Sequence, residues 1–139
     1  MPKLQLLKPR VLVIDDDPFI GSLLRRVFEQ TGRYSIAAER NALSALTTAR
    51  LFRPSLLIVD LSMPDRSGLE LAVDFRTEPV LRNCPIILFS GAFVPNLEEF
   101  AGTGQAPIEF MRKTTPLPQL IEAVDRLLEV KGKKESGGA

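Results

Sequence analysis

Polar side chains capable of chemistry follow four predicted strands of this 139-residue chain. Short apolar runs bounded by proline or loop residues are typical of strands buried on both faces of a parallel sheet. Because the carboxyl ends of parallel strands meet at one edge of the sheet, we expect these side chains to lie together there. They are Asp15 and Asp16, Asp60, Ser90 and Lys113.

This set of groups suits a magnesium ion and a phosphoryl group. Three carboxylates at one edge repel one another and require a cation. Mg²⁺ prefers oxygen ligands and is bound through one or two carboxylates, waters and a phosphate oxygen. The Lys113 ammonium supplies a point charge for a phosphate, and the Ser90 hydroxyl can bond a second phosphate oxygen. We therefore predict phosphoryl transfer onto a carboxylate, with Asp60 as the nucleophile.

Other charged or reactive residues have simpler explanations. Asp17 stands before Pro18, as the cap of a helix that has proline at its first position. Asp65 and Asp74 have the character of surface charges, and Cys84 that of a small residue entering a strand. A single Asp, Ser or Lys at a strand end is also most often a solvated loop residue. The prediction of chemistry rests on four strands that deliver compatible groups to one edge.

The apolar pattern predicts an α/β fold, a doubly wound five-stranded parallel sheet with helices on both faces and right-handed crossovers. Strands are expected at Val11–Ile14, Tyr34–Ala38, Leu56–Val59 with Asp60 at its end, Pro85–Ser90 and Ile108–Arg112. Helices are expected between Asp17 and Thr31, after Asn41, from about Gly68 to Thr77, near Asn96–Ala101, and across Leu117–Leu128. Residues 1–9 form a lead, 10–130 the domain, and 131–139 a polar tail or the start of a linker.

Composition excludes several classes of function. The formal net charge of +1 gives no case for nucleic acid or an anionic membrane as partner. No apolar run approaches the roughly 20 residues of a membrane span. The chain has no histidine, which excludes histidine acid–base catalysis and histidine metal ligands. A single cysteine fits a reducing, cytoplasmic compartment.

The combination of motifs resembles the receiver domain of response regulators in two-component signalling, the chemotaxis receivers among them, over nearly the whole chain. The matching elements are Val13-Ile14-Asp15-Asp16, Asp60-x-x-Met63-Pro64-x-x-x-Gly68, the hydroxyl of Ser90 and the amine of Lys113. Asp16 precedes Asp60 by 44 residues (60 − 16), and Asp60 precedes Ser90 by 30 (90 − 60). The resemblance implies a flavodoxin-like sheet with strand order 2-1-3-4-5.

The resemblance also implies roles for single residues. Asp60 would accept a phosphoryl group from a phosphohistidine on a sensor histidine kinase or phosphotransfer protein. Mg²⁺ would be bound by Asp16, Asp60 and the backbone carbonyl of Ser62, with Asp15 helping through water. Lys113 would contact the phosphoryl oxygens. Ser90 and Phe110 would form the switch pair.

The wider function is predicted from the resemblance together with the Gly- and Pro-containing segment 92–106 and the near-neutral net charge. The chain would relay a signal to a downstream protein on a face made by residues 92–106, the fifth strand and the last helix. It would not be an enzyme beyond its own phosphorylation and dephosphorylation, and the family admits a phosphorylation-linked dimer. Direct DNA binding and membrane association are not expected.

Two features depart from the family pattern. Thr114 follows Lys113, where the family usually has proline joined by a cis bond. Because a cis bond without proline costs about 2.5–4 kcal/mol, we expect the Lys113–Thr114 bond to be trans. Gly91 follows Ser90, where alanine is common. Both departures bear on switching more than on phosphorylation.

Two alternative functions remain open at this stage. A binding module could keep the fold without switching, as the altered Lys113 loop and a short fourth helix would favour. A phosphatase of the haloacid-dehalogenase kind also uses a strand-end aspartate and Mg²⁺. That class carries the motif Asp-x-Asp, whereas this chain has Ser62 in place of the second aspartate. Nucleotide binding is weaker still, because neither glycine-rich phosphate motif is present.

Overall fold

The computed structural model describes residues 7–91 and 106–130, and these form a parallel sheet of five strands in the order β2-β1-β3-β4-β5. Both the predicted fold class and the predicted strand order are confirmed. The strands are β1 (Arg10–Ile14), β2 (Ser35–Glu39), β3 (Leu56–Asp60), β4 (Ile86–Ser90) and β5 (Ile108–Arg112). β2 begins and ends one residue later than predicted, and Tyr34, just before it, packs edge-on against Phe28 of the preceding helix.

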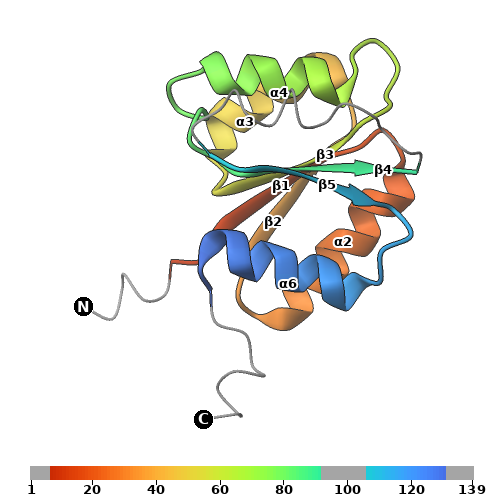
Figure 1. Cartoon of the computed structure of the whole chain (residues 1–139), viewed down its shortest axis with the longest axis vertical. Coiled ribbons are helices and arrows are strands. Elements are labelled where there is room, and N and C mark those ends of the chain that lie inside the picture. Colours follow the sequence, from red (N-terminus) through yellow and green to blue (C-terminus); the bar gives the residue numbers. More distant parts are fainter. Residues whose placement is uncertain (1–6, 92–105, 131–139) are drawn as a thin grey trace.

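Helices cover both faces of this sheet (Figure 1). Two of them, α3 (Ala45–Phe52) and α4 (Gly68–Thr77), lie on one face, while α2 (Pro18–Thr31) and α6 (Leu117–Leu128) lie on the other. No helix among the described residues is long and apolar enough to cross a membrane. The helix predicted near Asn96–Ala101, residues 131–139 and most of the lead lie outside the described residues.

The sheet separates two apolar cores, and alternate residues of each central strand enter opposite ones. From β3, Leu57 and Val59 pack with α3 and α4, whereas Leu56 and Ile58 pack with α2 and α6. All five residues of β3 are buried, as are all five of β4. Each fully buried aliphatic side chain contributes about 1.5–3 kcal/mol relative to exposure. β3 and β4 are therefore buried along their whole length, and their ends are well placed to carry a site.

Local sequence signals explain most helix ends. The Asp17 carboxylate accepts the Phe19 amide at 2.9 Å, which confirms Asp17 as the cap of α2. Gly32 ends that helix at φ 74°, a left-handed conformation that glycine adopts without steric cost. Asn41 accepts the Leu43 amide at 2.9 Å, but the residues it caps form the 3₁₀ turn η1 (Ala42–Ser44) before α3 begins.

Arg76 of α4 connects the segments that lead into β4 and β5. Its guanidinium donates to the carbonyls of Cys84 at 2.9 Å and Ala106 at 2.8 Å. Two longer bonds of 3.3 Å reach the carbonyls of Arg82 and Pro107. These carbonyls precede β4 and β5, so one side chain fixes both strands at the edge of the sheet opposite to Asp60.

Candidate functional site

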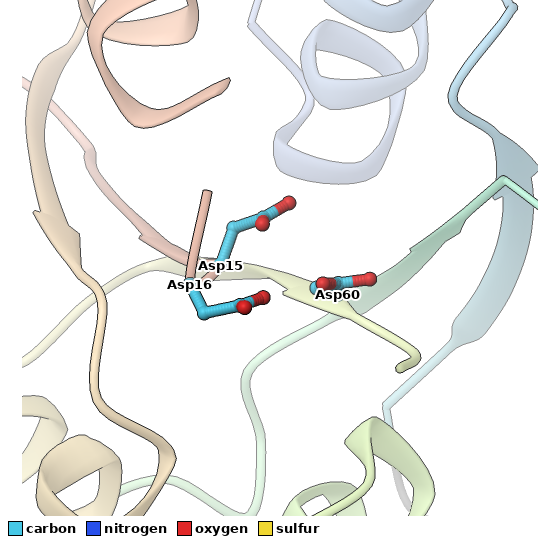
Figure 2. A group of neighbouring side chains, drawn as sticks. All are labelled: Asp15, Asp16 and Asp60. Atoms are coloured by element: carbon cyan, nitrogen blue, oxygen red, sulfur yellow. The ribbon is translucent and has the colours of Figure 1, made fainter. Parts of the chain in front are cut away.

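Three aspartates converge at the carboxyl edge of the sheet, as predicted (Figure 2). Asp15 and Asp16 follow β1, and their side chains project toward the end of β3, where Asp60 lies. One carboxylate oxygen from each residue falls within 4.8 Å of the other two. Asp15 and Asp60 are buried, at 3% and 4% exposure, whereas Asp16 is more accessible. Parallel pairing of β1 with β3 brings the strand ends together, since Ile14 is paired with Val59.

Lys113 bridges two of these carboxylates. Its Nζ lies 2.9 Å from Asp15 Oδ2 and 3.3 Å from Asp60 Oδ1. Its backbone amide donates to the Ser90 carbonyl at 2.7 Å, which continues the β4–β5 pairing beyond β5. Burial alone would lower the pKa of the Lys113 ammonium, but Asp15 and Asp60 outweigh burial and raise that pKa. The lysine therefore stays charged and holds the two buried carboxylates together.

Asp15 has little capacity left for a direct metal bond. Its Oδ1 accepts the Asp17 amide at 2.9 Å, and its Oδ2 faces Lys113. Both oxygens already have one partner each, and the water-mediated role that the resemblance implies for Asp15 stays a prediction. Asp16 makes no hydrogen bond or ion pair within residues 7–91 and 106–130, so its carboxylate is available as a ligand.

The pKa of Asp60 is raised from its usual value near 3.8 to about 6. Burial is the largest cause, and the nearby negative charge of Asp15 adds to it. The Ser62 amide, which donates to Asp60 Oδ1 at 3.2 Å, and the charge of Lys113 act in the opposite direction. Ionising Asp60 therefore costs free energy that a further cation at the site would offset.

The donor set fits a hard divalent ion. Three carboxylates carry three negative charges, Lys113 supplies one positive charge, and two negative charges remain beside oxygen donors. Mg²⁺ suits such a site because it binds few carboxylates and retains waters. Asp16 and Asp60 would hold it directly. Ser62 lies next to the cluster through its amide, while its carbonyl as a ligand stays a prediction.

Gly68 allows the loop after β3 to fold back onto the end of that strand. Its amide donates to the Leu61 carbonyl at 2.9 Å. A Cβ at this position would lie 2.4 Å from the Asp60 carbonyl oxygen, closer than any side chain tolerates. Ser67 closes the loop with a capping box, in which it and Glu70 exchange hydrogen bonds of 3.2 and 3.0 Å. Glycine is therefore required at position 68 because a larger side chain would collide with the backbone of Asp60.

The predicted switch residues lie on neighbouring strands. Ser90 is buried at the end of β4, and Phe110 is half-buried on β5. Strand pairing matches Leu88 with Phe110 and Ser90 with Arg112, so all four side chains project to the same face of the sheet. Ser90 and Phe110 are therefore diagonal neighbours across the β4–β5 pair. As predicted, the peptide bond after Lys113 is trans, and the described residues include no cis bond.

Sequence reasoning missed one residue that borders this site. Glu39, at the end of β2, accepts the Asp15 amide through its backbone carbonyl at 3.1 Å. Its side chain lines a groove together with Asp16. A glutamate at the end of a weak edge strand gives no signal of its own, because only the β1–β2 pairing brings it beside the aspartates.

Gly68→Ala should destabilise the protein by about 1–3 kcal/mol, since the added methyl group displaces the Asp60 backbone. Gly91→Ala is the matched control, because a Cβ on Gly91 meets no described atom within 4 Å. Urea unfolding followed by circular dichroism measures both. Equal stability of the two variants would contradict the close approach at Gly68.

Asp60→Asn should stabilise the protein by about 1–2 kcal/mol near neutral pH, and the gain should disappear near pH 4. The folded chain retains the Asp60 proton up to about pH 6, whereas an unfolded chain loses it near pH 3.8. Stability of the wild type therefore falls as pH rises through this window, and asparagine removes the fall. Unfolding curves at both pH values test this, and an equal gain at each would contradict it.

Comparison with known proteins agrees with this geometry. Residues 11–125 match the family described as the response regulator receiver domain. The polar-differentiation response regulator DivK of Brucella anthropi is 30% identical over 118 residues, covering 85% of this chain and 94% of DivK. The DivK of Brucella ovis is 28% identical over the same coverage.

Solved structures give the same result. The chemotaxis protein CheY4 of Vibrio cholerae is similar in fold, with a TM-score of 0.78, 21% identity, and coverage of 88% of this chain and 100% of that one. TrrA of Thermotoga maritima, solved in complex with Mg²⁺-BeF, has a TM-score of 0.74 and 30% identity, and the match covers 86% and 99% of the two chains. The chain therefore belongs to the response regulator receiver family.

Proposed function

We propose that this receiver accepts a phosphoryl group on Asp60 from the phosphohistidine of a sensor histidine kinase or phosphotransfer protein. An Asp60 carboxylate oxygen forms the bond to phosphorus, and the bond from phosphorus to the donor imidazole nitrogen breaks. The electron pair of that bond stays on the imidazole. The observation that carries this proposal is the position of Asp60, a buried carboxylate at the end of the central strand, 3.3 Å from the Lys113 ammonium.

Residues around Asp60 supply the charge that the transfer requires. Lys113 is close enough to turn from the two carboxylates to the phosphoryl oxygens, and Ser90 is a hydroxyl at the neighbouring strand end. Bound Mg²⁺ would neutralise charge on the phosphoryl oxygens, held by Asp16, Asp60 and the Ser62 carbonyl, with Asp15 acting through water. TrrA, at 30% identity, was crystallised with Mg²⁺ and the phosphoryl mimic beryllium fluoride, which supports this assignment.

We further propose that the signal leaves through a protein contact. Ser90 would move toward the phosphoryl group, and Phe110 would follow on the neighbouring strand. The contact face would be made by residues 92–106, β5 and α6, of which residues 92–105 lie outside the described part of the chain. The protein would act in the cytoplasm and catalyse only its own phosphorylation and dephosphorylation, with a phosphorylation-linked dimer as one form of output.

A non-switching binding module is the second candidate. The observation that favours it is the segment after β5, where Thr114 replaces the family's proline and the bond before it is trans. The Thr115 amide instead donates to the Arg112 carbonyl at 3.0 Å, which closes a turn over Arg112–Thr115 that contains Lys113. The phosphatase alternative has less support, because Ser62 offers Asp60 an amide rather than a second acid.

Asp60 should be the single site of phosphorylation. Incubation with Mg²⁺ and acetyl phosphate should add the mass of one phosphoryl group to the wild type and none to Asp60→Asn. Asp16→Asn should also remain unlabelled, because it removes a metal ligand. Asp17→Asn is the matched control, since asparagine caps a helix as well as aspartate does. Intact mass spectrometry gives the result, and equal labelling of Asp60→Asn and wild type would contradict the assignment.

The two candidates predict different hydrogen exchange after addition of Mg²⁺ and beryllium fluoride. A switching receiver should change protection in β5 and α6 as well as around Asp60, and Ser90→Ala should lose the distant change while still binding the mimic. A local opening free energy of a few kcal/mol is enough to register in exchange. Changes confined to the loops at Asp16, Asp60 and Lys113 would favour the binding module.

A further inference from the structure

We propose that Glu39 is a positioning residue for the cation site, through its hold on the backbone that carries Asp16. The inference rests on the proposed function only in assuming that Asp16 is a metal ligand. Glu39 ends β2, next to the turn that leads from β1 into the aspartates. It touches neither the phosphoryl acceptor nor, in this proposal, the metal.

The Asp16 side chain has no anchor of its own. Lys113 holds both Asp15 and Asp60, and backbone amides of Asp17 and Ser62 complete their contacts. Within the described ranges Asp16 makes no comparable bond. Its carboxylate is therefore placed by the backbone alone, and whatever fixes that backbone also sets the geometry of the ligand.

Two bonds flank Asp16 along the backbone. The Asp17 amide donates to Asp15 Oδ1 at 2.9 Å, and the last bond between β1 and β2 holds the residue before Asp16. The Asp15 amide donates to the Glu39 carbonyl at 3.1 Å, one residue before Asp16. β2 is an edge strand paired with β1 alone, so its end lacks a second neighbour to hold it in register. Ends of edge strands open at low free-energy cost unless other contacts secure them.

The Glu39 carboxylate supplies the missing contacts. Its Oε2 accepts the Asn41 amide at 2.9 Å, and its Oε1 accepts the Thr48 hydroxyl at 2.6 Å. Thr48 lies on α3, whose core-facing Ala45 and Ala49 are fully buried. The end of β2 is thus tied to a packed helix, and this holds the Glu39 carbonyl in place opposite the Asp15 amide.

Glu39 also shares a groove of about 330 Å³ with Asp16, Asn41 and Met63. Arg40 and Asp65 line the same groove, so Glu39 is one of several charged residues beside Asp16. Charge and positioning predict different mutational patterns. If Glu39 acts through its charge, only variants of Glu39 itself should weaken Mg²⁺ binding. If it acts by positioning the backbone, removing the Thr48 hydroxyl should weaken binding as well.

Two variants separate these contributions. Thr48→Val keeps the size of the side chain and the charge of Glu39 but removes the hydroxyl donor. Glu39→Gln removes the charge and one of the two acceptors. Glu78→Gln is the control, because Glu78 also ties α3 to another element, through an ion pair of 3.0 Å with Arg50, but does not line the groove beside Asp16.

Mg²⁺ titration of the purified chain, followed by NMR shifts of the Asp15–Asp17 amides, measures binding without phosphorylation. Thr48→Val should raise the Mg²⁺ dissociation constant about 2- to 5-fold and Glu39→Gln about 3- to 10-fold, the range of one hydrogen bond. Glu78→Gln should leave the constant unchanged although it lowers the thermal midpoint.

Either of two results would overturn the proposal. In one, Thr48→Val lowers the thermal midpoint and leaves Mg²⁺ binding unchanged, which would make Glu39 a purely structural or purely electrostatic residue. In the other, Glu78→Gln weakens binding as much as Thr48→Val does. Failure of Asp60 to become phosphorylated, with Mg²⁺ binding intact, would instead contradict the proposed function and leave this inference standing.

Discussion

Mutual repulsion among three carboxylates is the constraint to which the rest of this structure responds. Asp15, Asp16 and Asp60 bring oxygens within 4.8 Å of one another at an edge where two of them are buried. Such an arrangement persists only if a rigid scaffold imposes it and a cation offsets it. The scaffold is the pair of central strands β1 and β3, and within the described chain the cation is Lys113.

The lysine reaches the cluster because of the topology of the sheet. β5 lies beyond β4 in the strand order, and Lys113 extends from its end across the site to the ends of β1 and β3. It pairs more closely with Asp15, at 2.9 Å, than with Asp60, at 3.3 Å. The longer distance to Asp60 leaves that carboxylate partly uncompensated, and together with burial this agrees with the raised pKa of Asp60. The negative charge of Asp60 therefore lowers the stability of the folded chain at neutral pH.

The sequence was sufficient to predict the parts of the site that depend on chain-local patterns. Apolar runs that end in Asp15, Asp60 or Ser90 revealed strand ends, and parallel strands necessarily bring their ends to one edge. Asp17 as a helix cap, the capping box at Ser67 and Gly32 as a helix end follow from neighbours in sequence, and the structure confirms all three.

Contacts between distant segments could not be predicted in the same way. Glu39 is next to the site only through strand pairing, and Thr48 is its partner only through the position of α3. The need for glycine at position 68 was visible as a motif, but its reason is the distance of 2.4 Å to the Asp60 carbonyl, which no pattern encodes. Whether Lys113 lies closer to Asp15 or to Asp60 likewise depends on three-dimensional packing.

The hydrogen bonds of Arg76 do not depend on the side chains of the residues that accept them. All four of its acceptors are backbone carbonyls, which every amino acid possesses. The starts of β4 and β5 are therefore held together without any demand on side-chain type at Arg82, Cys84, Ala106 or Pro107. Any restriction on residue type there comes from packing instead, as at the buried Cys84 and Ala106.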